Sequence, residues 1–141
     1  MVNYRFKLSV QVRHPSADLA ALGTAIGRIP KAIWKCGERK RDREGRLIGD
    51  VMSSSYCTFE FNPETEGDDL DCAIGAAVQA LEPARALLAE LQKSGGEVAA
   101  AIGWFSSGNS GDVMGPQVVQ ALASLGMSIH LHIYCEATTS N

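Results

Sequence analysis

The stretch YRFKLSVQVR, residues 4–13, alternates apolar and polar residues one by one. Successive side chains of a β-strand point to opposite faces of the sheet, so this pattern predicts a strand with one apolar and one polar face. The apolar set is Tyr4, Phe6, Leu8, Val10 and Val12, and the polar set is Arg5, Lys7, Ser9, Gln11 and Arg13. We therefore expect a sheet that is dry on one side and wet on the other.

The rest of the chain supplies helices that could cover the dry side. Apolar residues recur at helical spacing in three places, and Pro83 predicts either a kink or a second helix within the second of them. Acidic residues at 68, 69 and 71 favour the start of that second helix. We expect helices over 17–26, from about 70 to 94 and over 118–125, and further strands over 32–36, 55–61, 98–105 and 127–135.

This order of elements predicts an α+β fold. Its first six elements, strand-helix-strand-strand-helix-strand, have the pattern of ferredoxin-like folds, and one more helix and strand follow. We expect a two-layer sandwich with a mainly antiparallel sheet and helices on one face. A chain of 141 residues suits one domain, so we assign 1–141 to a single unit, ordered over about 3–136 with a short polar tail.

The formal net charge of −3 hides an uneven distribution along the chain. Residues 1–46 hold 11 of the 13 Lys and Arg but only 4 of the 16 acids, a net of +7, so the remainder carries −10. Six of the bases lie within 35–46, where three acids are interspersed. We interpret this segment as an exposed hairpin connection, and its candidate binding residues are Trp34, Lys35, Glu38, Arg39, Arg41 and Arg43. The intervening acids and the lack of interleaved aromatics make nucleic acid an unfavoured partner.

His130 and His132 form the second candidate binding site. They alternate with Ile129, Leu131 and Ile133, so both imidazoles are expected on one sheet face, where acid-base or metal chemistry is conceivable. A catalytic zinc ion needs three protein ligands, however, and the other candidates, His14, Glu60 and Glu136, have no spacing that makes them converge. We expect no metal, no cofactor and no catalytic residue.

The glycine-rich segment Gly103–Ser110 has the glycine spacing of a phosphate-binding loop. Asn109 stands where that loop needs its lysine, so a strand-to-helix connection is the better interpretation.

Cysteine usage and hydropathy indicate the compartment. Cys36, Cys57, Cys72 and Cys135 show no Cys-x-x-Cys pair, which favours reduced thiols. The alternating first strand is unlike an export signal, and Gly115, Pro116 and Gly126 interrupt the longest uncharged run. We expect a cytoplasmic protein without a membrane segment.

Several short motifs together resemble a known bacterial family. They are Pro30 with Trp34-Lys35-Cys36-Gly37-Glu38, the polar hairpin, the strand ending at Phe61, and Leu125-Gly126 with Ile133-Tyr134. In this order the chain is similar to the bacterial domain of unknown function 4279 over roughly 4–134. The resemblance implies a small bacterial cytosolic domain and transfers no active-site residue.

The leading functional hypothesis is a non-enzymatic binding or protein-interaction module, including an inhibitor or immunity-type protein. Its partner would be another protein or a second copy of the chain. The alternative is a small ligand-binding domain or enzyme that uses the polar face around His130 and His132. The third possibility is weak nucleic-acid binding through the basic hairpin.

Overall fold

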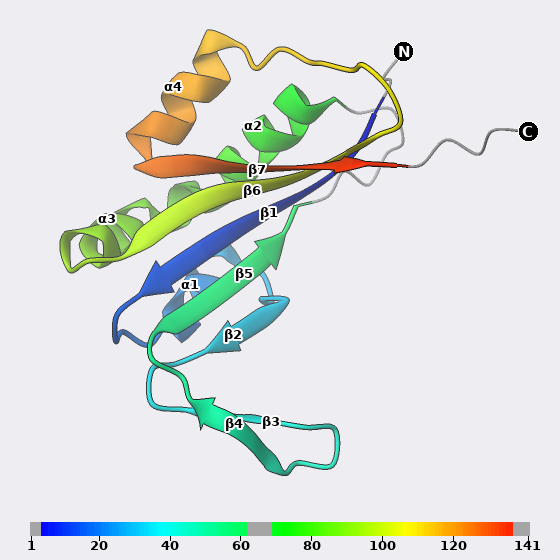
Figure 1. The fold of residues 1–141 in the computed structure, drawn as a ribbon. Helices are drawn as coiled ribbons and strands as arrows, with labels where there is room; N and C mark the ends of the chain where they lie inside the picture. Colours follow the sequence, from blue (N-terminus) through cyan, green and yellow to red (C-terminus); the bar gives the residue numbers. More distant parts are fainter. Residues whose placement is uncertain (1–3, 62–68, 137–141) are drawn as a thin grey trace, which may run out of the picture.

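The computed structural model describes residues 4–61 and 69–136. The expected polar tail at 137–141 and the acidic residue at 68 lie outside the described residues. Within them, the prediction of an α+β fold is confirmed: one five-stranded sheet carries helices, and a second, two-stranded sheet stands apart (Figure 1).

The strand predicted from the alternating stretch lies in the middle of the sheet. The strand order is β2-β5-β1-β6-β7, and all neighbours are antiparallel except β6 and β7, which are parallel. The bounds are β1 Arg5–His14, β2 Ala32–Trp34, β5 Ser55–Glu60, β6 Glu97–Ser106 and β7 Met127–Cys135. Strand β1 is therefore hydrogen-bonded on both sides, whereas β2 and β7 are the two edges.

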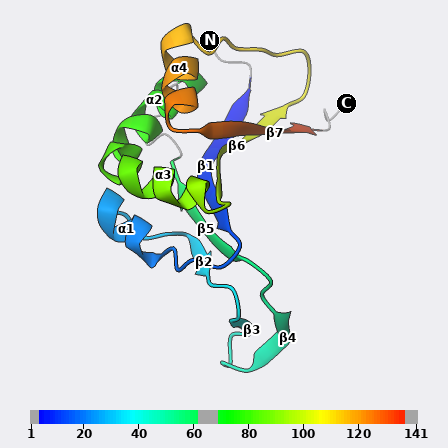
Figure 2. The same cartoon turned by 90° about the vertical axis from the view of Figure 1, so that its left-hand side faces the viewer.

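The helices pack against one face of this sheet, which forms the second layer (Figure 2). Their bounds are α1 Ala20–Ile26, α2 Leu70–Leu81, a 3-10 turn Glu82–Ala84 called η1, α3 Arg85–Lys93 and α4 Pro116–Ser124. The expected kink or second helix at Pro83 takes the form of η1 followed by α3, because proline tolerates the first turn of a helix better than its interior. No helix formed by the described residues covers the other face of the sheet.

Helix α1 starts at Ala20, three residues later than the sequence predicts. The side chain of His14 explains the difference, because its Nδ1 accepts hydrogen bonds from the backbone N–H groups of Ser16 (3.0 Å) and Ala17 (2.8 Å). These contacts hold the chain in a turn before the helix. Asp18 then accepts a hydrogen bond from the N–H of Ala20.

Helix α2 begins where the acidic residues predict. Asp69 is its N-cap, and its Oδ1 accepts a hydrogen bond from the N–H of Cys72 at 2.8 Å. This hydrogen bond stabilises the ionised carboxylate and lowers the pKa of Asp69.

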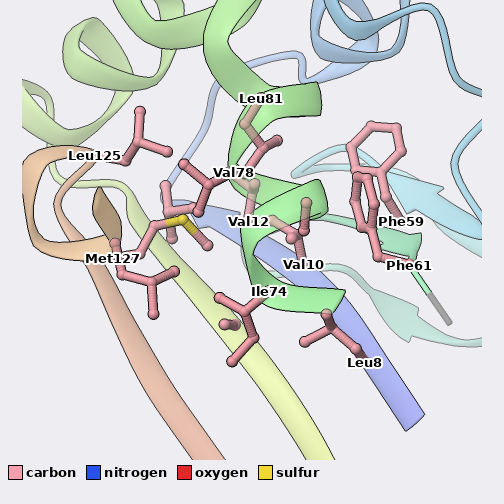
Figure 3. Packing of buried hydrophobic residues seen from close by; sticks show 14 of the residues in the cluster. Leu8, Val10, Val12, Phe59, Phe61, Ile74, Val78, Leu81, Leu125 and Met127 are labelled. Atoms are coloured by element: carbon pink, nitrogen blue, oxygen red, sulfur yellow. The ribbon is translucent and has the colours of Figure 1, made fainter. Parts of the chain in front are cut away.

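The core lies between the dry face of β1 and the helices above it. Leu8, Val10 and Val12 are at most 1% exposed, and they face Ile74 and Val78 of α2 (Figure 3). Burial of each such side chain favours folding by about 1.5–3 kcal/mol before the loss of conformational entropy. The alternation of the first strand thus determines which side of the sheet the helices cover.

The continuous helical stretch Leu70–Lys93 passes a test of length and composition for a membrane-spanning helix. In this structure its apolar side chains, including Leu70, Ile74 and Leu81, are buried against the sheet. Such burial is the behaviour of a core helix in a folded domain.

Strands β3 (Arg39–Arg41) and β4 (Leu47–Val51) pair with each other and form a separate antiparallel ribbon. We call residues 39–51 the arm. The arm extends from the β2 and β5 end of the sheet and points away from the helical layer and its core (Figures 1 and 2). The exposed hairpin predicted for this segment is thus longer than expected and reaches Val51.

Candidate functional site

The predicted binding residues fall into two groups at opposite edges of the sheet. Trp34 ends β2, and Lys35, Glu38, Arg39, Arg41 and Arg43 follow it into the arm. His130 and His132 lie on β7 at the other edge. Because β5, β1 and β6 separate the two edges, the structure does not unite these residues in one site.

The root of the arm is held by ring stacking and local hydrogen bonds. The indole of Trp34 stacks on the ring of Tyr56 with 4.6 Å between centroids, and the guanidinium of Arg13 lies 4.8 Å from the same Tyr56 ring. The Glu38 carboxylate accepts a hydrogen bond from the N–H of Lys35, and the Glu38 carbonyl accepts one from the N–H of Met52. Trp34 and Glu38 therefore position the arm.

The tip of the arm is a tight turn organised by Asp42. Its carboxylate accepts hydrogen bonds from the N–H groups of Glu44 (3.0 Å) and Arg46 (2.9 Å). Gly45 has a φ of 83°, which favours glycine there. One of the acids interspersed among the arm's bases is thus used to form the turn, as aspartate often is.

In the part of the chain that the structure describes, the basic side chains of the arm have no acidic ion-pair partner. None of Arg39, Lys40, Arg41, Arg43 and Arg46 forms an ion pair with any described residue. Arg41 and Arg39 instead donate to the backbone carbonyls of Gly45 and Gly49, which fixes the two guanidinium groups along the ribbon. Apolar side chains lie among them and are strongly exposed: Leu47 is 44%, Ile48 40% and Val51 54% exposed.

The two histidines lie on the open face of the sheet, as predicted, and both are exposed. His130 lines a depression of only about 20 Å³ together with Arg13 and Glu97, and the ring of His132 lies 6.5 Å from that of Tyr134. Ligand pockets usually measure about 300–1,000 Å³, so this depression is too small to enclose a substrate.

The residues considered as further metal ligands serve other contacts. His14 accepts backbone hydrogen bonds through Nδ1, and its Nε2 lies 2.8 Å from Oγ of Ser94. Glu60 pairs with Lys31, and Glu136 pairs with Arg5. In the described part of the chain, no three His, Cys, Asp or Glu side chains cluster as metal ligands would.

A pocket of about 390 Å³ lies on the helix side of β6 and β7, on the opposite face from the histidines. Its apolar wall includes Ile102 and Trp104 of β6 and the alternate β7 residues Ile129, Leu131 and Ile133. The segment 106–114, which leaves β6 and leads toward α4, supplies the remaining wall. The alternation of residues 127–135 in the sequence shows which β7 side chains share this face. It does not show that Ile129, Leu131 and Ile133 remain partly exposed there.

Three hydrogen bonds tether the polar wall of this pocket. The indole Nε1 of Trp104 donates to Oγ of Ser110 at 2.9 Å, and the N–H of Gly115 donates to Oδ1 of Asp71 at 2.7 Å. The buried phenol of Tyr4 donates to the carboxylate of Asp112. The glycine-rich segment is therefore a pocket wall, and α4 begins only at Pro116, far from the glycine spacing of a phosphate loop.

These features define a small two-layer α+β domain with an exposed charged arm, an apolar pocket and an open sheet face. The chain belongs to the family described as domain of unknown function DUF4279, whose model matches residues 5–136. No curated protein and no solved structure matches the chain. The ferredoxin-like assignment therefore stays a prediction.

The buried Tyr4 hydroxyl and its hydrogen bond to Asp112 make the free energy of unfolding fall at alkaline pH. Burial first, and the hydrogen bond to Asp112 second, raise the pKa of Tyr4 above its ordinary value. Because the folded-state pKa exceeds the unfolded value, this stabilisation is complete below about pH 10 and is lost as the pH rises further. Tyr4→Phe should cost about 1–2 kcal/mol at neutral pH, and its unfolding free energy should fall less than the native protein's above about pH 10.

Urea unfolding at a series of pH values measures this difference. Tyr56→Phe is the matched control, because no described residue hydrogen-bonds its hydroxyl. If the unfolding free energies of the native protein and of Tyr4→Phe changed in parallel with pH, Tyr4 would not contribute as described.

Proposed function

We propose that this chain is a non-enzymatic protein-interaction module of the bacterial cytoplasm that captures an acidic protein through its arm, as an inhibitor or immunity-type protein would. The observation that carries this proposal is the arm itself, a ribbon that projects from the domain with every residue of β3 and β4 exposed. An isolated two-stranded hairpin is marginally stable in water. The arm thus gives the domain little stability, which favours a role outside it.

The composition of the arm suits a protein partner with negative charge. Arginine presents a planar set of donors that matches carboxylates, and several unpaired arginines raise the rate of encounter with an acidic surface. The exposed Leu47, Ile48 and Val51 add apolar area that such a partner can cover. Charge would then speed the association of the two proteins, and apolar contact would stabilise the bound complex.

Two further observations support an intracellular binding role. Cys36, Cys57 and Cys135 form no disulfide with any described residue, as in a reducing compartment. The described residues around His130 form a depression of only about 20 Å³, and the pocket of about 390 Å³ lies on the opposite face of the sheet, which disfavours the hypothesis of an enzyme built around His130 and His132.

Charge reversal of the arm tests the proposal. The variant Arg39→Glu/Arg41→Glu/Arg43→Glu should lose the protein that co-purifies with the native chain from its own cells, because three attractive contacts become repulsive. Once that protein is identified and purified, titration calorimetry should show binding at least about tenfold weaker for the variant, and native binding should weaken with salt.

The matched control is Arg28→Glu/Lys31→Glu/Lys93→Glu, which changes the net charge equally at exposed bases outside the arm. The pairs Lys31–Glu60 and Lys93–Glu90 are exposed, so this control should still fold and bind. The proposal is wrong if the native chain elutes alone, if nucleic acid elutes in place of protein, or if both variants bind equally.

A second candidate function is the binding of a small molecule in the pocket beside β7. Its volume of about 390 Å³ lies within the usual range for ligand sites, and apolar side chains form much of its wall. Asp112 is the charged residue among those that line it. A neutral or cationic, largely apolar molecule fits this chemistry, whereas a phosphate would meet no basic side chain among the described residues of the lining.

Tryptophan fluorescence distinguishes this second function. Trp104 lines the pocket, and Trp34 lies at the opposite edge of the sheet, so single-tryptophan variants report on each place separately. In a screen of apolar amines and alcohols, a ligand should shift the emission of Trp34→Phe, which retains Trp104, and raise its melting temperature. The emission of Trp104→Phe should not change. No response in either variant would rule out ligands of this class.

A further inference from the structure

The two edges of the sheet differ in how they are protected. β2 is three residues long and is flanked by Lys31 and Lys35, and short length and lysine are common protections against edge pairing. β7 is nine residues long and contains no Asp, Glu, Lys or Arg. No described strand pairs with its outer edge. A long, uncharged, unprotected edge is a site for pairing with another strand.

We propose that two copies of this chain associate through β7, whose outer edges pair antiparallel around a two-fold axis at Leu131. This register pairs all nine residues of both strands. It places Leu131 opposite Leu131 of the second copy and Ile129 opposite Ile133 of the second copy. The pairing joins two five-stranded sheets into one continuous sheet.

The alternation along β7 makes the strand complementary to itself. Residues directly opposite in an antiparallel pair lie on the same face, so the apolar set meets its own kind. A slip by one residue would place the apolar residues opposite the histidine-bearing set, which disfavours registers shifted by an odd number of residues. Ile129 is 38%, Leu131 53% and Ile133 66% exposed in the single chain, so pairing would cover apolar area that is now in water.

The absence of charge on β7 favours a second copy over the acidic partner of the arm. Two acidic or two basic edges would repel each other, whereas two uncharged edges do not. An acidic protein would find no basic side chain on β7 itself. The association is thus a property separate from the function proposed for the arm.

The histidines would make this association sensitive to pH. In the register centred on Leu131, His130 lies opposite His132 of the second copy, and the reverse pair forms across the axis. Histidine ordinarily gains charge between about pH 8 and pH 5. Protonation would therefore place like charges opposite each other twice.

The other charged groups near these histidines have both signs. Arg13 and Glu97 line the same depression as His130. Tyr134 adjoins His132, and Lys7 lies one strand further away, beyond Gly103. Because these groups do not supply one dominant charge, repulsion between facing imidazoles should control the response to acid.

Analytical ultracentrifugation of the full chain tests the inference. At pH 8 the mass should approach twice 15.0 kDa as concentration rises. Leu131→Lys places two lysines together at the axis and removes two leucines, so its dimer dissociation constant should rise at least about tenfold. Ile29→Lys makes the same exchange of an apolar for a basic side chain at a residue that is 94% exposed and outside the sheet, and it should dimerise normally.

Acid should dissociate the native dimer, and His130→Gln/His132→Gln should remain dimeric at pH 5. A mass of 15.0 kDa at every concentration, or a dimer that Leu131→Lys leaves intact, would overturn the inference. That result would leave the function proposed for the arm untouched. The arm is tested by a separate experiment, the partner binding of the variant with reversed arm charges. Circular dichroism of Leu131→Lys should match that of the native chain and so check that the variant is folded.

Discussion

The hydrogen bonding of β1 to both of its neighbours is the interaction on which the rest of the structure depends. Its alternation places Leu8, Val10 and Val12 under the helices and leaves Arg5 and Lys7 on the other face. A shift of one residue in either pairing would bury charge and expose the core. The helical layer, the open face and the two edges all follow from that register, and the surfaces proposed for binding are those that the core leaves uncovered.

The register of β1 also determines where the unevenly distributed charges of the sequence lie in the fold. On the open sheet face the basic residues of β1 meet acids from the later part of the sequence: Arg5 pairs with Glu136, and Arg13 lies opposite Glu97. The sheet therefore mixes the two charged halves. The bases of the arm form no ion pair with any described residue, so their positive charge remains available to another molecule.

Local patterns in the sequence predict most of the fold, because strand alternation, helical spacing, the cap at Asp69 and the break at Pro83 act over a few residues. These local patterns do not predict features that depend on contacts between residues distant in the sequence. The later start of α1 depends on the His14 side chain, and the pocket depends on segment 106–114 lying beside β6 and β7. The alternation correctly predicts one face for His130 and His132, yet it could not show that β7 is an edge or that Trp34 lies at the opposite one.

Amide hydrogen exchange with site resolution tests the central role of β1 most directly. A strand paired on both sides opens only with the whole domain, whereas a ribbon outside the core opens locally. We expect the paired amides of β1 to exchange slowest in the chain and those of the arm to exchange many times faster, with the protection of β1 falling in step with global stability in urea. If the β1 amides exchanged at rates equal to those of the arm, β1 would not have this central role.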